Sequence, residues 1–269
     1  MIPKIIHYVW VGSKPKPSLL LKCIASWKRY CPDYEIREWN NESAAQIDNL
    51  YLQQALQTKK YAFASDYLRL YALRNEGGFY FDSDLEITHS IDKMREFPFI
   101  SGYENWEGLY SPITAFMGAC KDSCIIKDLI SEYTDLPFIV NGEPDLTTNT
   151  RRITSYFKSK YGLSEPYNGH DTTLLGEDGI LYPSYYFCTP EEGKDNYAIH
   201  HFNASWKIYE NWERKKLFSI ARYKLVSFKK LFEQDEDKFP LRDGEQEIKK
   251  WVIKNDYIIS LLKKRRKDL

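Results

Sequence analysis

Residues 60–84, KYAFASDYLRLYALRNEGGFYFDSD, decide the fold class of this chain. Residues 60–75 predict a helix, because one face of it would carry the apolar side chains Ala64, Leu68, Tyr71 and Ala72. Gly77-Gly78 ends the helix, and Gly78–Phe81 then has the apolar character of a buried central strand. A helix that leads into a buried strand with polar residues at its end is typical of α/β sheets that bind ligands beyond their strands.

The beginning of the chain predicts the same class. Lys4–Val11 and Tyr34–Trp39 have strand patterns, and Pro17–Tyr30 between them has apolar residues at helical spacing. Weaker patterns further along predict two strands, a helix and two long loops: Phe99–Tyr103, Ile113–Gly118, Ile125–Tyr133, Asn141–Arg152 and Asn168–Gly179. We therefore expect an α/β fold with a Rossmann-like, open, mixed sheet flanked by helices.

Length and composition narrow the class of protein. The 269 residues suit one substantial α/β domain, and 38 basic and 38 acidic side chains give no reason to expect nucleic acid as a partner. The five cysteines form an odd set without a CxxC motif, which fits a reducing compartment. The N-terminus lacks the apolar run of a signal peptide, and no stretch approaches 18 apolar residues. A cytoplasmic location is expected.

The basic residues gather at the C-terminal end. Residues 213–269 contain 17 basic and 10 acidic side chains, and apolar residues lie between them. The expected division is a main domain over residues 1–210 and a basic, amphipathic, helical region over residues 211–269. Such helices bind anionic membrane surfaces, which would place the protein on the inner face of the cell membrane. The alternative is a helical appendage that packs on the core and keeps a solvated charged face.

Two carboxylates follow the predicted central strand. Side chains at i, i+2 and i+4 of a strand share a face, so Tyr80, Asp82 and Asp84 are expected to point toward one site. A pair of carboxylates can hold one divalent cation and leave positions open for phosphate oxygens. An Asp-x-Asp alone is a weak signal, because such pairs also cap helices or lie in solvent. In this context it indicates a metal that stabilises a leaving pyrophosphate.

Other polar residues supply that context. Asp66 and Arg69 lie three apart on one face of the predicted helix. They either form a surface salt bridge, or Asp66 accepts hydrogen bonds from sugar hydroxyls while Arg69 orients it or contacts the phosphate-sugar oxygen. Further along, His200 and His201 would face opposite ways on a strand, so at most one ligates the metal. Imidazole with two carboxylates suits manganese better than magnesium.

Three blocks of sequence together resemble family 32 of the glycosyltransferases, the group with a DXD sugar-binding region: IPKIIHYVWVG, KYAFASDYLRLYALRNEGGFYFDSDLE and HHFNASW. The group includes bacterial capsular-polysaccharide transferases, and the first two blocks also resemble the catalytic domain of the clostridial glucosylating toxins. The resemblance implies a GT-A fold and a retaining hexosyl transfer that depends on Mn²⁺, with Mg²⁺ as the alternative. The implied donor is a UDP-sugar, with UDP-galactose or UDP-glucose favoured and an N-acetylhexosamine donor and GDP-mannose left open. The implied acceptor is a glycan or lipid-linked oligosaccharide.

The resemblance also implies roles for individual residues. Trp10 would stack on the uracil while the backbone near Val9 reads the edge of the base. The donor sugar, ribose and phosphates would be held by Ser65, Asp66, Arg69, Tyr80, Ser83, Ser205 and Trp206. Asp82 and Asp84 would bind the metal, Asp84 the more directly, and His201 would complete the shell. Gly142–Thr147 matches the pattern of the family only loosely, so it gives little guidance on the acceptor.

Two other classes of function remain open in the sequence. A haloacid-dehalogenase-like phosphatase also places Asp-x-Asp after an apolar strand, but it normally has Thr or Val where this chain has Glu86. A non-catalytic sugar-binding module would explain the aromatic content but not a metal site. For a retaining transferase, no residue can be named as a covalent nucleophile, and substitution on the face of the leaving group is the alternative.

Overall fold

The computed structural model describes residues 1–106 and 108–203. These residues belong to Met1–Trp206, the first of two compact units into which the chain divides. The expected helical region at 211–269, the boundary at residue 210, and the candidate donor residues Ser205 and Trp206 all lie outside the described part. Within that part, no helix is long and apolar enough to cross a membrane.

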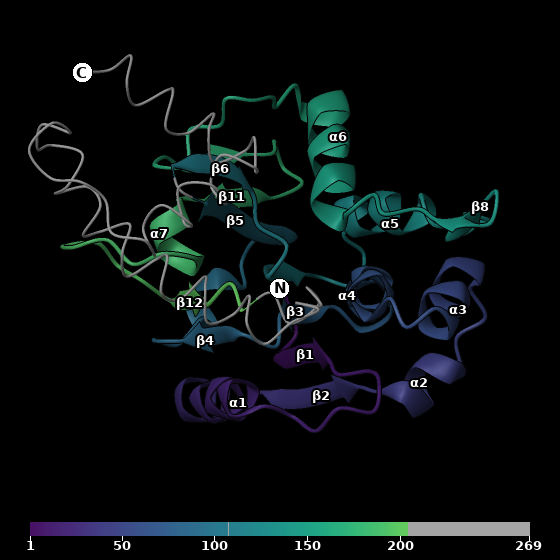
Figure 1. The fold of residues 1–269 in the computed structure, drawn as a ribbon. Helices are drawn as coiled ribbons and strands as arrows, with labels where there is room; N and C mark the ends of the chain where they lie inside the picture. The colour runs from purple at the N-terminus through teal and green to yellow at the C-terminus, as the bar shows by residue number, and fades with distance from the viewer. Residues whose placement is uncertain (107, 204–269) are drawn as a thin grey trace, which may run out of the picture. The chain divides into compact units, whose positions relative to one another are not determined.

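An eight-stranded mixed sheet forms the centre of the described unit (Figure 1). Its order is β10 (Thr173–Leu174), β11 (Ile180–Tyr182), β5 (Phe99–Trp106), β7 (Phe116–Ala119), β3 (Gly78–Phe81), β1 (Ile5–Val9) and β2 (Glu35–Trp39), and β6 (Leu109–Pro112) pairs with β5. The pairs β1–β2, β1–β3 and β5–β11 are parallel, whereas β3–β7, β5–β7 and β10–β11 are antiparallel. The expected α/β class and mixed sheet are confirmed.

Helices cover both faces of this sheet. Figure 1 shows α1 and α7 on one side and α3 to α6 on the other. Their bounds are α1 Ser18–Tyr30, α2 Asn41–Ala45, α3 Leu50–Gln57, α4 Tyr61–Glu76, α5 Cys124–Ser131, α6 Asn149–Tyr161 and α7 Ser184–Phe187, with a short 3₁₀ turn at Asp92–Met94. Two small ladders complete the fold: β4 (Leu85–Ile87) with β12 (Ala198–His200), and β8 (Ile139–Val140) with β9 (Glu143–Pro144).

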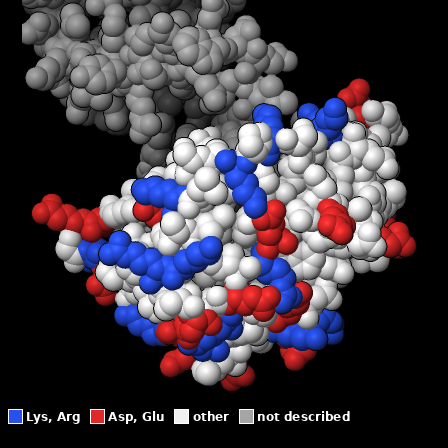
Figure 2. Space-filling model, turned by 90° about the horizontal axis from the view of Figure 1, so that it is seen from below, with Lys and Arg blue, Asp and Glu red and all other residues white. Residues whose placement is uncertain are grey.

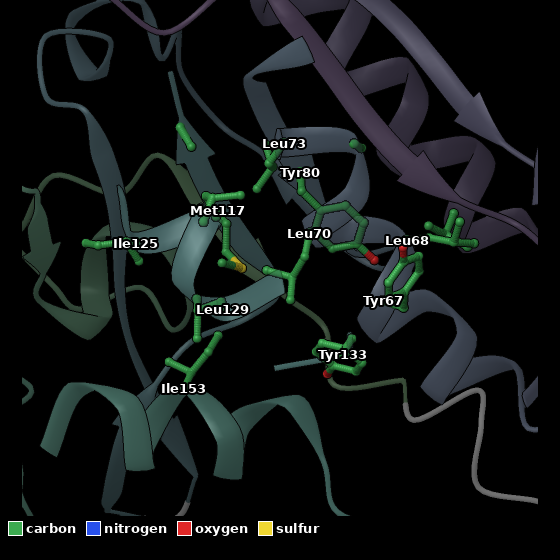
Figure 3. Packing of buried hydrophobic residues seen from close by; sticks show 14 of the residues in the cluster. Tyr67, Leu68, Leu70, Leu73, Tyr80, Met117, Ile125, Leu129, Tyr133 and Ile153 are labelled. Carbon is green, nitrogen blue, oxygen red and sulfur yellow. The ribbon is translucent and has the colours of Figure 1, made fainter. Parts of the chain in front are cut away.

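Each face of the sheet has its own hydrophobic cluster. Figure 3 shows the cluster on the α4 side, where Leu73 and Tyr80 pack toward Met117, Leu129 and other side chains of α4, α5 and α6. The opposite cluster joins α1 and α7 to the sheet through buried residues that include Trp27, Phe79, Phe81, Phe116 and Phe187. The alternation in β3 therefore sends Phe79 and Phe81 into one cluster and Tyr80 into the other, as the sequence predicts.

A buried histidine fixes the point where α4 meets β3. His7, in β1, hydrogen bonds through Nε2 to the carbonyl of Gly77 (2.8 Å), and its Nδ1 accepts from the indole of Trp39 (3.2 Å). Burial lowers the pKa of His7, so the ring is neutral with Nε2–H as donor. Gly78 follows with φ of 102°, and a Cβ there would lie 2.7 Å from the carbonyl oxygen of Ile5. Only glycine fits this junction.

The later part of the chain differs more from the sequence prediction. The segment 141–152, expected to be a long loop, contains β9 and the start of α6. Only Ile153 and Phe157 are buried apolar residues of α6, too few for a clear periodic pattern. The expected strand Ile113–Gly118 begins only at Phe116. Residues 113–115 are not part of it, because the amide of Ile113 donates to the carbonyl of Gly102 in β5 and the carbonyl of Ala115 accepts from the amide of Asp82.

The described surface mixes charges of both signs. On the face shown in Figure 2, basic and acidic side chains lie among one another. Many charged side chains of the described residues form ion pairs, including Lys4 with Asp33, Lys16 with Glu38, and Arg37 with Glu76. The absence of a nucleic-acid partner stays a prediction from the sequence.

Candidate functional site

Asp82-Ser83-Asp84 forms the turn that joins β3 to β4. The amide of Asp82 donates to the carbonyl of Ala115 (2.9 Å), and the amide of Leu85 donates back to the carbonyl of Asp82 (3.0 Å). Asp84 therefore lies in a turn and not in an extended strand, contrary to the face-sharing argument from the sequence. The turn still brings both carboxylates to the end of the buried strand β3, which is where ligands bind in open α/β sheets.

The strand β12 brings an imidazole to these carboxylates. It pairs antiparallel with β4, with His200 opposite Leu85. His200 Nε2 lies 3.6 Å from Asp84 Oδ1, and the amide of Asn203 donates to Asp84 Oδ2 (2.7 Å). Ligand atoms of Asp82, Asp84 and His200 all lie within 4.8 Å of one another. Two carboxylates and one imidazole this close form a donor set that fits a divalent transition metal.

The electrostatics of the pair Asp84–His200 favour opposite charges. Burial alone would raise the pKa of Asp84, but His200 and the amide of Asn203 hold it below its usual value. Burial alone would lower the pKa of His200, but Asp84 raises it to about 10. Without a metal, His200 therefore carries a proton at neutral pH, and a metal bound by His200 would require the loss of that proton.

The neighbouring histidine has a different partner. His201 Nε2 lies 2.8 Å from Glu86 Oε2, and the same oxygen accepts from Lys22 Nζ (2.7 Å). The sequence prediction that only one of the two histidines faces the carboxylates agrees with this geometry, but the choice of His201 does not. The structure places His200 in the metal-binding group, because the pairing of β12 with β4 sets which side chain turns toward Asp84.

Arg69 holds two carboxylates at once. Its Nη2 lies 3.1 Å from Asp66 Oδ1 and 3.3 Å from Asp82 Oδ1, and its Nη1 donates to the carbonyl of Thr114 (2.7 Å). Only 4% of the side chain is exposed. The salt bridge Asp66–Arg69 is thus buried, and the alternative of a surface pair does not hold. Because its donors are used within the protein, Arg69 orients Asp66 and Asp82, and the predicted contact with the donor's phosphate-sugar oxygen finds no support in this geometry.

Asp66 lies at the junction of α4 and α6. Its Oδ2 accepts from the amide of Asn149, the first residue of α6 (3.2 Å). Burial raises the pKa of Asp66 to about 6, although Arg69 and the amide of Asn149 oppose the rise. Asp66 is therefore a carboxyl that can either accept or donate a hydrogen bond near neutral pH.

Tyr80 lies beneath the site. It is 2% exposed, its hydroxyl donates to Asp82 Oδ1 (2.9 Å), and the guanidinium carbon of Arg69 lies 4.6 Å from the centre of its ring. The structure thus does not place Tyr80 where a base or ribose could contact it. Its role here is to support Arg69 and Asp82 from the core.

The remaining candidate residues occupy separate positions in the fold. Trp10 follows β1, is partly exposed, and donates from its indole to the carbonyl of Lys14 (3.0 Å). Val9 is buried, and Ser65 is bonded to the carbonyl of Ala62 within α4. Ser83 is partly exposed in the turn between the two aspartates. Close to Trp10, whose amide bonds the carbonyl of Trp39, a hollow of about 390 Å³ is lined by Glu38, Asn40, Glu42, Ser43 and Gln46.

Three residues near the site were not found from the sequence. Asn149 and Asn203 act through backbone amides, which leave no signal in side-chain type. Glu104, in β5, is partly buried and accepts from the hydroxyl of Ser111 (3.0 Å). An acidic residue directly after the predicted strand Phe99–Tyr103 is a signal of the same kind as Asp82.

Residues 17–99 match the family described as the glycosyltransferase sugar-binding region containing a DXD motif. Within this stretch the chain is similar to glycosyltransferases. The match covers less than a third of the chain but includes Asp66, Arg69 and Asp82-Ser83-Asp84, which stands as its DXD motif. It supports the prediction of a transferase enzyme and gives no support to a phosphatase or a non-catalytic module. No curated protein matches the sequence.

The solved structures that the chain matches include glycosyltransferases, at TM-scores below 0.5. The PaToxG glycosyltransferase is 20% identical, with 60% of this chain and 70% of that chain covered and a TM-score of 0.45. A glycosyltransferase involved in glycosylation of the major capsid of PBCV-1 is 15% identical, with 74% and 93% covered and a TM-score of 0.40. The galactosyltransferase LgtC, in complex with donor and acceptor sugar analogs, is 12% identical, with 69% and 87% covered and a TM-score of 0.35.

Proposed function

We propose that this chain is a metal-dependent glycosyltransferase of the GT-A type that moves a hexose from a UDP-sugar to a glycan acceptor. The observation that carries the proposal is the convergence of Asp82, Asp84 and His200 at the end of β3, inside a segment similar to a DXD sugar-binding region. Carboxylates and an imidazole together favour manganese, with magnesium as the alternative. When bound, the ion would act as a Lewis acid toward the departing pyrophosphate.

The chain's own residues hold and orient the reactants in this proposal. Asp66 accepts hydrogen bonds from hydroxyls of the donor sugar, and Arg69 fixes its position relative to Asp82 through one shared guanidinium. Trp10, at the carboxyl end of β1, offers a partly exposed indole for the base. Arg69 bonds to both Asp66 and Asp82. The residue proposed to bind the sugar therefore keeps a fixed position relative to one of the residues proposed to bind the metal.

The resemblance of the sequence to family 32 supports a more specific reaction. We infer a retaining transfer with UDP-galactose or UDP-glucose as donor, in surface or capsular polysaccharide synthesis. The acceptor is then a glycan, best a lipid-linked oligosaccharide, and the enzyme works in the cytoplasm at the inner face of the membrane. The basic composition of residues 213–269 supports this location, because it suits an anionic lipid surface.

A thermal-shift panel tests the proposal. We expect Mn²⁺ with UDP-glucose or UDP-galactose to raise the melting temperature, since a ligand at 100 times its Kd stabilises the folded state by about 2.7 kcal/mol. GDP-mannose and a UDP-N-acetylhexosamine complete the panel. Asp84→Ala should abolish the shift and keep the far-UV circular dichroism of the native protein. Asp33→Ala, an exposed aspartate away from the site, is the matched control and should keep the shift.

An undiminished shift in Asp84→Ala would remove Asp84 from the metal site. Release of phosphate from phosphate esters, with no shift from any nucleotide sugar, would favour a phosphatase in its place.

A further inference from the structure

Glu104 belongs to the β5–β6 hairpin at the edge of the site. It lies opposite Ser111 in the hairpin, and the Ser111 hydroxyl donates to its Oε1 at 3.0 Å. The side chain is partly buried yet retains some exposure, so a ligand can reach it. Within residues 1–106 and 108–203, no Lys, Arg or His forms an ion pair with this carboxyl. None of the roles proposed above uses it.

A short segment connects the strand of Glu104 to the rest of the site. The amide of Ile113 donates to the carbonyl of Gly102 in β5 (2.8 Å). The carbonyls of the next two residues bond to the other part of the site. That of Thr114 accepts from Arg69 (2.7 Å), and that of Ala115 accepts from the amide of Asp82 (2.9 Å). Residues 113–115 therefore contact β5 on one side and the Arg69–Asp82 pair on the other.

The alternation of β5 gives the direction of Glu104. Gly102 and Glu104 share a face, and a Cβ on Gly102 would lie 3.1 Å from the ring of Phe187, in α7. Directly after α7, the carbonyl of Cys188 accepts from the amide of His200 (3.0 Å). The neighbour Tyr103 points the opposite way, toward Thr173. Glu104 thus faces the side of β5 on which His200 lies.

The charges around Glu104 agree with this placement. Burial raises the pKa of Glu104 above its usual value, His200 acts against that rise, and Asp82 adds to it. The charges of His200 and Asp82 therefore influence the pKa of Glu104, although Glu104 is hydrogen bonded to neither residue. A carboxyl with a raised pKa beside a polar site has the properties of a general acid or base.

We propose that Glu104 accepts the proton of the acceptor hydroxyl during glycosyl transfer, an inference that rests on the proposed function. The acceptor oxygen forms a bond to the anomeric carbon as the bond from that carbon to the donor phosphate breaks. The electron pair of the broken bond stays on the phosphate oxygen, and the proton passes to Glu104. A covalent nucleophile would have to approach from the side away from the phosphate, whereas Glu104 lies on the side of β5 where His200 lies, which is the side of the residues that would hold the metal and the phosphate.

Hydrolysis of the donor tests this role, with water as the acceptor. In Glu104→Gln we expect kcat for UDP release from the nucleotide sugar that shifts the wild type to fall about 100-fold or more, with KM within twofold, since loss of a general base costs typically 10² to 10⁴. The Mn²⁺-dependent and donor-dependent thermal shift should stay at the wild-type value. Glu177→Gln, the same change at an exposed position, is the control and should keep kcat.

Chemical rescue provides a second readout that does not depend on the folding of the Gln variant. In Glu104→Ala, added formate should restore part of the UDP release, and acetamide, which cannot take the proton, should not. Wild-type kcat in Glu104→Gln, loss of its donor-dependent shift, or absence of formate rescue would each overturn the proposal. If the wild type itself shows no shift with any nucleotide sugar, the proposed function fails, which is a different result.

Discussion

At the scale of single residues, the candidate metal site depends on which of two adjacent histidines lies beside Asp84. Asp82, Asp84, Asp66 and Arg69 were all identified from the sequence, because two of them share a helix face and the other two directly follow the buried strand. Asp84 reaches the site through a turn and not through strand alternation. His200 could not be distinguished from His201 in the same way. That choice depends on the pairing of β12 with β4, a contact between segments more than a hundred residues apart.

The charge pair Asp84–His200 makes a prediction about pH. The pKa of His200 rises from an ordinary 6.5 to about 10 in the folded, metal-free protein. The pair therefore contributes stability that is complete below about pH 6.5 and is lost as pH rises toward 10. Melting temperatures of EDTA-treated protein should decline over this range, and His200→Gln should flatten the decline.

The adjacent histidine is the control for this experiment. His201→Gln removes the neighbouring imidazole, which is more exposed than that of His200 (28% against 11%) and bonds to Glu86, and should leave the decline in place. In the wild type, Mn²⁺ affinity should also increase as pH rises, since metal binding releases the His200 proton. Equal pH profiles for the two variants would mean that the pair does not control the titration.

At the scale of elements, α1 fixes the position of the metal-binding turn. The indole of Trp27 donates to the carbonyl of Leu85 (2.8 Å), and the hydroxyl of Ser26 accepts from the amide of Ile87 (3.0 Å). Both bonds lie in the buried cluster that contains Phe81. The sequence predicted α1 as a helix but gave no sign that two of its side chains bind the strand after Asp84.

Trp27→Phe tests this connection. The change leaves the buried Leu85 carbonyl without its donor and reduces the packed volume, so we expect a loss of about 2–4 kcal/mol in the free energy of unfolding. Urea denaturation measures the loss. Leu21→Ala, at a position of α1 that is 54% exposed, should stay within about 0.5 kcal/mol. A similar value for both variants would show that the bond to β4 contributes nothing.

At the scale of the whole molecule, the accuracy of sequence prediction falls along the chain. Up to β7 the sequence predicted β1, α1, β2, α4, β3, β5 and β7, because periodicity, apolar runs and glycine positions mark these elements. It did not predict α2, α3, β4 or β6, which are short. Beyond that point α6 carries only two buried apolar residues, and Asn149 acts through its backbone. Glu104 is brought to the site by residues 113–115, which are neither helix nor strand there.

The basic C-terminal region gives a prediction for the whole chain, made from sequence because it lies outside the described residues. Replacement of Lys263, Lys264, Arg265, Arg266 and Lys267 by Gln should weaken binding to phosphatidylserine vesicles by at least about tenfold, since each basic residue near the surface contributes about 1 kcal/mol. Cosedimentation measures this binding. The control is the same assay with neutral phosphatidylcholine vesicles, to which neither protein should bind.

The ladder of three residue pairs between β4 and β12 has a consequence for how this enzyme can change. A slip of the ladder by one residue would turn His201 toward Asp84 and His200 toward the side of Glu86 and Lys22. Both arrangements place a histidine beside Asp84, so the slipped form would keep the kinds of metal ligand. The position of the imidazole relative to Asp82 would change. Insertions or deletions in residues 189–197, which precede β12, are therefore expected to be tolerated only where they preserve this register.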